Sequence, residues 1–362
     1  RARMPNKFSN TSNGYYYQAK SSNPFIVDTS EIKNWSKLNQ VECVWQSHWH
    51  EKRARISGFT VNGLASTILF TSPENSEPSL NHSPSDTSPG YFTYYYYENA
   101  YEFIDAEGEW YYDKTSHTLF YKPRKNEDMS TAEVVVPQID NIIKLTGTNS
   151  DYIHDIQFLG LAFEYSNWNK PNSTGYLNWQ AGVQLNTDNG SVVPGMVELD
   201  YARNIRFERN LFKNSGAHGL VTLHNTNGNK IIGNVFTNLA GGGIYINSTI
   251  ENTSSAFDTI QNNLVEFVGQ VYTDVVGILA TRVTNISIEH NLVRYCPYTG
   301  ISLGWSWDDT DQGCKSNRVS FNEVHDFEQL LDDGAGIYTL GRMDSTFINN
   351  NYVYNCVKSP YA

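Results

Sequence analysis

An asparagine recurs at a nearly constant interval through the second half of the chain, and such an interval constrains the fold more than any local pattern. Successive recurrences are separated by 24, 29, 28, 31 and 29 residues. Around each asparagine, apolar and polar residues alternate over a few positions, which is typical of a half-buried β-strand. The six asparagines are Asn210, Asn234, Asn263, Asn291, Asn322 and Asn351.

A second series consists of glycines that each precede a short apolar strand, and it alternates with the first. These glycines are separated by 24, 34, 23 and 36 residues. Two strands and two turns per repeat describe one coil of a solenoid in which equivalent positions stack. The glycines are Gly219, Gly243, Gly277, Gly300 and Gly336.

A parallel β-helix accounts for both series, so we expect an all-β fold with this solenoid over residues 146–362. Inward Ile, Leu, Val and Phe side chains would stack into an apolar column. The asparagines would form a ladder in one turn, each amide bonding to the copies above and below. A β-propeller needs a longer repeat of about 40–50 residues, and the L-x-x-L-x-L pattern of leucine-rich repeats is missing.

Residues 1–145 lack the repeat, and we expect them to form a β-rich appendage packed on the helix or inserted near its start. Aromatic segments such as "GYFTYYYYENAYEF" favour antiparallel strands. The Ser/Pro-rich run from Thr71 to Tyr91 is typical of a long surface loop or a linker.

The charge balance restricts the partners. The chain has 26 basic and 38 acidic residues, a net charge of -12, which argues against nucleic acid and mildly disfavours polyanionic glycans. Charged residues make up only 18%, which with many Gly, Tyr and Asn residues suits an extracellular β-rich protein. No run of 18 apolar residues predicts a membrane span, and we expect a monomer.

No cofactor or metal motif stands out. The four cysteines lack any C-x-x-C spacing, so neither a zinc site nor a redox motif is indicated, although disulfides are possible. The segment "DDTDQG" lacks the ligand spacing and distal glutamate of a helix-loop-helix calcium site. The chain opens with "RARMPN" and stops in mid-pattern, so we expect both ends to be processed or trimmed.

Two acids share a register position. Asp274 and Asp333 each stand three residues before a glycine of the second series, two coils apart, with Pro297 at the same position between them. Strands about 4.8 Å apart would put their Cα atoms about 9.6 Å apart on one edge. Such a pair suits a glycosidase, with one carboxyl donating a proton and the other attacking the sugar or activating water, by retention or by inversion. Alternatively, both are turn residues that cap backbone N–H groups.

Aromatic residues near these acids predict a platform for sugar rings. Outward aromatics follow the strand starts, and a polar loop, "GYLNWQAG", would fold over the same face. A histidine could reach a sugar hydroxyl, although a lone histidine is more often structural. The aromatic residues could likewise shield a core in place of binding a sugar. The candidate substrate-binding residues are Trp305, Trp307, Asp308, Asp332, His218, Tyr245, Tyr338, Trp179 and Gln180.

Several segments together resemble one known family. "ENAYEFIDAEGEWYYDKTSHTLFYKPRKNEDM", "GLAFEYSNWNKP", "GYLNWQAG", "IEHNLV", "GISLGWSWD" and "DDGAGIYTLG" are similar to right-handed parallel β-helix proteins related to glycoside hydrolase family 141. The resemblance extends over nearly the whole chain. It implies a secreted or periplasmic enzyme that acts on a polysaccharide or oligosaccharide, with family activities that include α-L-fucosidase and xylanase.

The resemblance also implies a catalytic pair of acids, which the register assigns to Asp274 and Asp333, with Asp308 and Asp332 as alternates. The leading hypothesis is therefore a glycoside hydrolase acting on a plant or algal polysaccharide. A uronate lyase or epimerase would need cations for the sugar carboxylate, and Arg282 and Arg342 are the candidates. A glycan-binding solenoid without catalysis is the third reading, because a fold alone does not fix a function.

Overall fold

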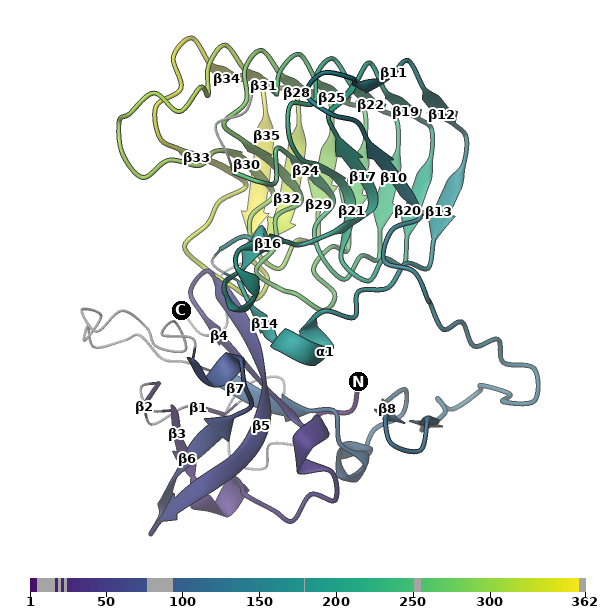
Figure 1. Ribbon diagram of the computed structural model, residues 1–362, viewed down its shortest axis with the longest axis vertical. Coiled ribbons are helices and arrows are strands. Elements are labelled where there is room, and N and C mark those ends of the chain that lie inside the picture. Colours follow the sequence, from purple (N-terminus) through teal and green to yellow (C-terminus); the bar gives the residue numbers. More distant parts are fainter. Residues whose placement is uncertain are drawn as a thin grey trace.

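The computed structural model describes residues 1–4, 17–18, 21–22, 25–76, 94–178, 180–250 and 255–357. Its main feature is a stack of coils in which each strand pairs in parallel with the equivalent strand of the next coil (Figure 1). The fold is therefore nearly all β, with a parallel β-helix and an antiparallel N-terminal part, as the repeats predicted.

The β-helix has three sheets of seven strands each. The first sheet contains β10 (Ile143–Thr146), β17 (Gly195–Asp200), β21 (His218–Thr222), β24 (Ile244–Ile246), β27 (Ile278–Thr281), β30 (Ile301–Gly304) and β33 (Ile337–Leu340). The second contains β12 (Gln157–Leu159), β19 (Arg206–Glu208), β22 (Lys230–Ile232), β25 (Thr259–Gln261), β28 (Ser287–Glu289), β31 (Arg318–Ser320) and β34 (Phe347–Asn349). The third contains β13 (Ala162–Glu164), β20 (Leu211–Lys213), β23 (Val235–Thr237), β26 (Leu264–Glu266), β29 (Leu292–Arg294), β32 (Glu323–Phe327) and β35 (Tyr352–Cys356). A two-stranded sheet of β11 (Ile153–His154) and β18 (Ala202–Arg203) lies between the first two in the early coils.

Each coil has three main strands, so the expectation of two strands per coil was wrong. The asparagine unit holds two short strands, one in the second sheet and one in the third, joined by a tight turn. The residue before each asparagine turns the chain by taking a left-handed conformation, as Asn262 (φ 55°) and Phe321 (φ 57°) do. Two short strands separated by one left-handed residue keep the alternation of apolar and polar residues, so the sequence shows them as a single strand.

The predicted asparagine ladder is confirmed. Asn263 is a typical member: its side-chain oxygen accepts from the backbone N–H and the Nδ2 of Asn234 at 2.9 and 3.0 Å. Its own Nδ2 donates to Ile231 O at 2.8 Å and to Asn291 Oδ1 at 2.9 Å. The ladder therefore satisfies buried backbone groups that the tight turn leaves without strand partners. It runs unbroken through Asn210, Asn234, Asn263, Asn291, Asn322 and Asn351.

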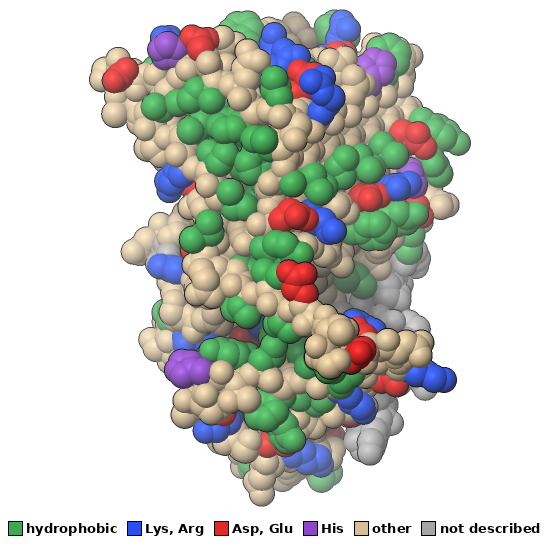
Figure 2. All heavy atoms as spheres, turned by 90° about the vertical axis from the view of Figure 1, so that its right-hand side faces the viewer, with side chains coloured by type: hydrophobic (Ala, Val, Ile, Leu, Met, Phe, Trp, Pro, Cys, Tyr) green, Lys and Arg blue, Asp and Glu red, His purple; other side chains and the backbone are tan. Residues whose placement is uncertain are grey.

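The apolar column lies inside the three sheets. Equivalent residues of successive coils are in contact, as in the stacked rings of Phe212 and Phe236, whose centroids are 4.3 Å apart. The column is less covered at the first coil, where Phe158 is only partly buried, and the outward-facing Leu159 of the same strand is 44% exposed. Figure 2 shows hydrophobic side chains gathered on this end of the molecule.

The N-terminal part is one twisted antiparallel sheet with the order β1-β7-β4-β5-β6-β3-β2. Its core is rich in aromatic rings. The aromatic segments form antiparallel strands, as the sequence predicted, both in β7 and in a separate hairpin of β8 (Trp110–Asp113) and β9 (Thr118–Tyr121). Residues 77–91 of the Ser/Pro-rich run lie outside the described residues. The strands of the sheet are β1 (Tyr17–Gln18), β2 (Ser21–Ser22), β3 (Phe25–Asp28), β4 (Glu42–Ser47), β5 (His50–Asn62), β6 (Ala65–Phe70) and β7 (Tyr94–Glu98).

A segment of the β-helix part contributes one strand to the N-terminal sheet. After β13 the chain leaves the coils over residues 165–194, forms α1 (Pro171–Thr174), and adds β14 (Tyr176–Leu177) to the edge of β5 before it returns. A small hairpin of β15 (Gln184–Leu185) and β16 (Ser191–Val192) completes this excursion. The expected division between residues 145 and 146 falls within β10.

Two further observations concern the cysteines and the membrane. Cys43, Cys296 and Cys314 are buried, Cys356 is exposed, and all four are free thiols. Within the described ranges, no helix combines the length and the apolarity that crossing a bilayer requires.

We predict that Asn263→Ala lowers the free energy of unfolding by at least about 2 kcal/mol, because it leaves several buried polar groups without partners. Neighbouring Asn262 is the matched control, since it is exposed and has a left-handed φ that glycine adopts freely. Asn262→Gly should therefore change stability little. Equal midpoints of the two variants in denaturant titrations would contradict the ladder's role.

A second prediction concerns Asp258, whose burial raises its pKa to about 7. Because the folded pKa is above the unfolded value near 3.9, the stabilisation is complete below about pH 4 and is lost as the pH rises toward 7. Asp258→Asn should remove this loss. The melting temperature of the variant minus that of the wild type should therefore increase between pH 4 and pH 7.

The same turn supplies the control. Asn317 occupies the position equivalent to Asp258 two coils later, and its Nδ2 donates to Val283 O at 2.9 Å. An asparagine at 258 should therefore fit, and Asn317→Asp should acquire the pH dependence that Asp258→Asn loses. A melting-temperature difference between Asp258→Asn and the wild type that does not vary with pH would be the contrary result.

Candidate active site

The candidate site lies where the β4–β5 hairpin meets the starting edge of the first sheet. The hairpin tip contacts two coils at once: Glu51 N–H donates to Asp274 Oδ2 at 3.2 Å, and Asp332 N–H donates to His48 O at 3.2 Å. Thr273 extends the contact by accepting from Gln46 Nε2 at 2.9 Å. One hairpin therefore holds the segments that lead into β27 and β33.

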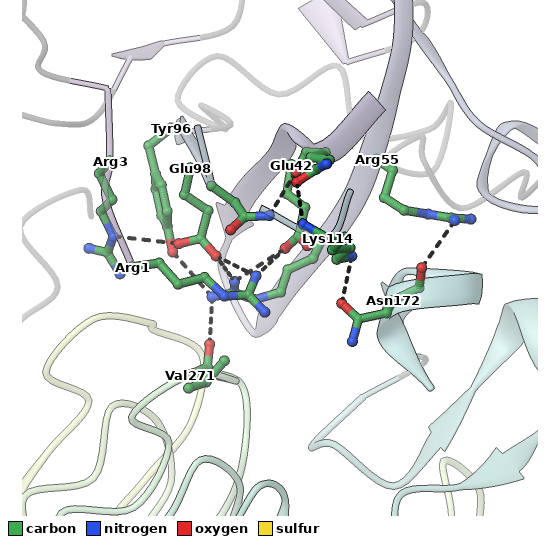
Figure 3. Close-up of polar contacts among 12 residues, drawn as sticks. Arg1, Arg3, Glu42, Arg55, Tyr96, Glu98, Lys114, Asn172 and Val271 are labelled. Atoms are coloured by element: carbon green, nitrogen blue, oxygen red, sulfur yellow. Dashed lines mark hydrogen bonds and ion pairs between the residues drawn. The ribbon is translucent and has the colours of Figure 1, made fainter. Parts of the chain in front are cut away.

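A buried ion-pair network fixes the base of this hairpin (Figure 3). The Arg53 guanidinium bonds to Glu51 at 2.9 Å and to Glu98 at 2.5 Å, and it also donates to Val271 O on the coil side at 2.7 Å. Burial alone would raise the pKa of Glu98, but the guanidiniums of Arg53 and Arg1 hold it below its usual range. Separating the hairpin from the coil, or removing one partner of the network, would leave an uncompensated buried charge, which is strongly unfavourable.

The predicted register of the two acids is confirmed, since Ile278 pairs with Ile301 and Ile301 with Ile337. Asp274 and Asp333 each lie four residues before their strand's isoleucine, on the same edge of the sheet. Their surroundings differ, because the hairpin and the 165–194 excursion cover Asp274 and leave Asp333 exposed to solvent.

Asp274 is sealed from solvent, which corrects its expected role as an accessible member of the catalytic pair. It is fully buried and accepts hydrogen bonds from Tyr176 Oη at 2.7 Å, from Asn178 Nδ2 and from Glu51 N–H. Burial raises its pKa to about 7. In this structure Asp274 joins the excursion, the hairpin and the coil, and its carboxyl has no surface that a glycosidic bond could reach.

Asp333 is exposed and occupies a left-handed turn position with φ 58°. Partial burial raises the pKa of its carboxyl, the nearby His48 works in the opposite direction, and Asp332 and Glu328 raise it further. A carboxyl with a raised pKa beside other carboxylates is the usual state of a general acid.

Asp332 is held by the hairpin. His48 Nδ1 lies 2.7 Å from Asp332 Oδ1, and each side chain is 25% exposed. The pair therefore reaches the surface, but its geometry is fixed by the contact between the N-terminal part and the β-helix.

Tyr298 and Tyr338 lie near Asp333, and Gln180 contacts Tyr298. The Tyr298 hydroxyl donates to Asp333 O at 3.1 Å and also meets the Gln180 side chain. Tyr338 is half-buried in the outward column of the first sheet, where burial and the Asp333 carboxylate raise the pKa of its hydroxyl. Of the predicted substrate-binding residues, Tyr338 is thus near the exposed acid, and Gln180 is linked to it through Tyr298.

Trp305 and Trp307 follow β30, as predicted, but they differ in exposure. Trp305 is 3% exposed and belongs to the same buried cluster as Tyr298 and Leu331, whereas Trp307 is 55% exposed. Their ring centroids are 5.3 Å apart in an edge-to-face arrangement. Only Trp307 therefore presents a ring to solvent, and Trp305 supports it from below.

His218 and Tyr245 are structural, which corrects their expected role in sugar binding. Both are fully buried, their rings stack at 3.9 Å, and the excursion covers them. His218 Nδ1 accepts from Gly242 N–H at 2.7 Å, so its Nε2 carries the proton toward Gly182 O at 2.8 Å. Burial lowers the His218 pKa to about 4. The Tyr245 hydroxyl donates to Ala181 O at 2.6 Å.

Asp308 orders its own loop. Its carboxylate accepts from Thr310 N–H at 3.1 Å and from Ser306 Oγ at 3.0 Å, and the bonds from Thr310 lower its pKa. In the part of the chain that the structure describes, no three His, Cys, Asp or Glu side chains gather as metal ligands. Trp179 lies outside the described residues.

The residue that the sequence interpretation missed is His48. Its segment, "QSHWHEK", places a His-Trp pair at the two-residue tip of a hairpin, where Asn and Gly are usual. That unusual turn was the only local signal, because the contact with Asp332 joins residues 284 positions apart.

The comparisons with known proteins concern the family and the fold. Residues 1–124 match a family model described as the GH141 insertion domain. A solved structure described as a glycoside hydrolase superimposes with a TM-score of 0.82 and 26% identity, covering 97% of this chain and 67% of that one. No curated protein matches the sequence.

A second solved structure, described as XylC in complex with xylose, is 12% identical and covers 97% of this chain and 50% of its own, with a TM-score of only 0.36. At that score the two sites are not comparable. The insertion-domain match and the first structure both support a glycosidase, and they relate this chain to glycoside hydrolase family 141.

Proposed function

We propose that this chain hydrolyses glycosidic bonds of a plant or algal polysaccharide, with an α-L-fucosidase-like or xylanase-like specificity, and that Asp333 is its general acid. The observation that carries the proposal is the exposure of Asp333 beside a second surface carboxylate, Asp332. The raised pKa of Asp333 keeps its proton available at higher pH than an ordinary aspartate would.

The second carboxylate is Asp332 in this proposal, in place of the buried Asp274. Hydrolysis needs one carboxyl that protonates the leaving oxygen and one carboxylate that attacks the sugar or activates water. Asp332 lies next to Asp333 and is held by His48, so it is available for the second role. The anomer of the first product then distinguishes retention from inversion.

The substrate is a neutral sugar chain. Trp307 offers an exposed ring for the apolar face of a sugar, and Trp305 joins it to the cluster beneath Asp332. Of the two cations considered for a uronate, Arg342 bonds to Asp344 at 2.6 Å, and Arg282 contributes to the lowered pKa of Asp308. These contacts favour hydrolysis over uronate elimination.

A secreted or periplasmic monomer is the form that we propose for this enzyme. A polysaccharide is found outside the cytoplasm, and the net charge of -12 leaves neutral glycans as the better partner than polyanionic ones. Fractionation of the source cells and light scattering of the purified chain test these two points.

The function is tested by incubating the protein with fucosylated, xylan and sulfated algal polysaccharides and following product anomers by NMR. We predict release of reducing sugar, and a fall in kcat of about 10²–10⁴-fold for Asp333→Asn, the usual contribution of a general acid. Asp309→Asn, an exposed aspartate in the loop after Trp307, is the control and should keep wild-type activity. Wild-type kcat in Asp333→Asn, or products absorbing as unsaturated uronates, would refute this assignment.

A separate prediction concerns Asp274. Asp274→Asn keeps an acceptor for Asn178 and for Glu51 N–H, so it should fold and lose less than about tenfold in kcat, against the much larger loss of a catalytic acid. Asp274→Ala leaves those donors buried without a partner and should lower the melting temperature. If Asp274→Asn were as inactive as Asp333→Asn while melting like the wild type, Asp274 would be catalytic after all.

A further inference from the structure

The hairpin tip is built from residues that a tight turn does not favour. Ser47 pairs with His50, so His48 and Trp49 alone form the loop, and His48 has a left-handed φ of 47°. Glycine and asparagine adopt this conformation at less cost than histidine. A strained residue persists when the contacts of its side chain compensate for the strain.

Trp49 anchors the tip on the β-helix. Its ring packs against the buried cluster on the outward face of the first sheet, which includes Ala181, Leu331 and Trp305. It also lies 6.0 Å from the His48 ring and 5.0 Å from the His50 ring, between centroids. The tip is thus held on the coil side as well as at its ion-paired base.

His48 contacts Asp332 through both its side chain and its backbone. Its Nδ1 lies 2.7 Å from Asp332 Oδ1, and its carbonyl oxygen accepts from Asp332 N–H at 3.2 Å. Backbone and side chain of one residue therefore fix both the backbone position and the carboxylate direction of the other. The turn that carries Asp333 is fixed with it, because Asp332 and Asp333 are consecutive.

We infer that His48 is a positioning residue of the hydrolytic site: the N-terminal part reaches over the β-helix and orients Asp332 beside Asp333. The inference rests on the proposed function. It gives the insertion region a role in turnover as well as in packing, because the site is complete only when the hairpin is docked.

Charge adds a second effect. His48 bonds to Asp332, and its own hairpin carries His50 and Glu51. The titratable groups that act on Asp333 or respond to it are His48, Asp332 and Glu328, together with Tyr298 before β30 and Tyr338 in β33. The His48 imidazole lowers the pKa of Asp333 and so opposes the burial that raises it. Removing the imidazole should therefore move the basic limb of the pH–rate profile upward, since Asp333 would hold its proton longer.

The test uses variants that preserve the turn. His48→Gly removes the imidazole and relaxes the left-handed residue, so the hairpin should fold. We expect its kcat to fall about 10²-fold, the scale of a misplaced reacting group, with KM nearly unchanged and the basic limb shifted upward. His48→Asn restores a donor and tolerates the same φ, so it should recover part of kcat but not the pH profile.

Two controls isolate the contact. His154 also bonds to an aspartate, Asp155, at 2.7 Å, but it is the exposed last residue of β11 in the first coil, so His154→Gln should leave kcat, KM and pH profile unchanged. In an Asp332→Asn background, His48→Gly should cause little further loss, because a positioning residue acts through its partner.

The outcomes separate the inference from the function on which it rests. An active wild type with an unchanged kcat and pH profile in His48→Gly would overturn the role of His48 alone. Full additivity of His48→Gly and Asp332→Asn would also overturn it. A wild type inert on every glycan would overturn both.

Discussion

The vertical stacking of coils is the constraint on which the rest of this structure depends. Each strand of the β-helix pairs with its equivalent in the next coil, so residues many positions apart arrive at the same edge. The asparagine ladder keeps that stacking in register, because each side chain satisfies buried backbone groups that the tight turn would otherwise leave unpaired. Without a fixed register, neither the acids nor the aromatic residues would share a surface.

The features that the sequence predicted are those that repeat. The ladder through Asn263 and the alignment of Asp274 with Asp333 followed from intervals alone. The third strand in each coil was not visible, because a kink at one residue, such as Phe321, leaves the alternation of apolar residues intact. Periodicity reports which positions are equivalent, and it does not report where the backbone bends between them.

The sequence could not show which equivalent position stays in solvent. Burial of Asp274, His218 and Tyr245 is imposed by the hairpin and the excursion, segments that lie outside the repeat. The contact between His48 and Asp332 joins the two parts of the chain for the same reason. Sequence reasoning therefore predicted which acids share an edge of the first sheet, and tertiary contacts then determined that Asp333 is exposed and Asp274 is buried.

The proposed site therefore lies where the N-terminal part contacts the β-helix. There Asp333 is exposed, Asp332 is bonded to His48 of the hairpin, and Trp307 is exposed in the loop after β30. A crystal structure of the Asp333→Asn variant with an oligosaccharide from the substrate screen tests this most directly. The account predicts that the glycosidic oxygen lies within hydrogen-bond distance of residue 333 and that a sugar ring packs on Trp307. A sugar bound to another sheet, with residue 333 in contact with water alone, would contradict it.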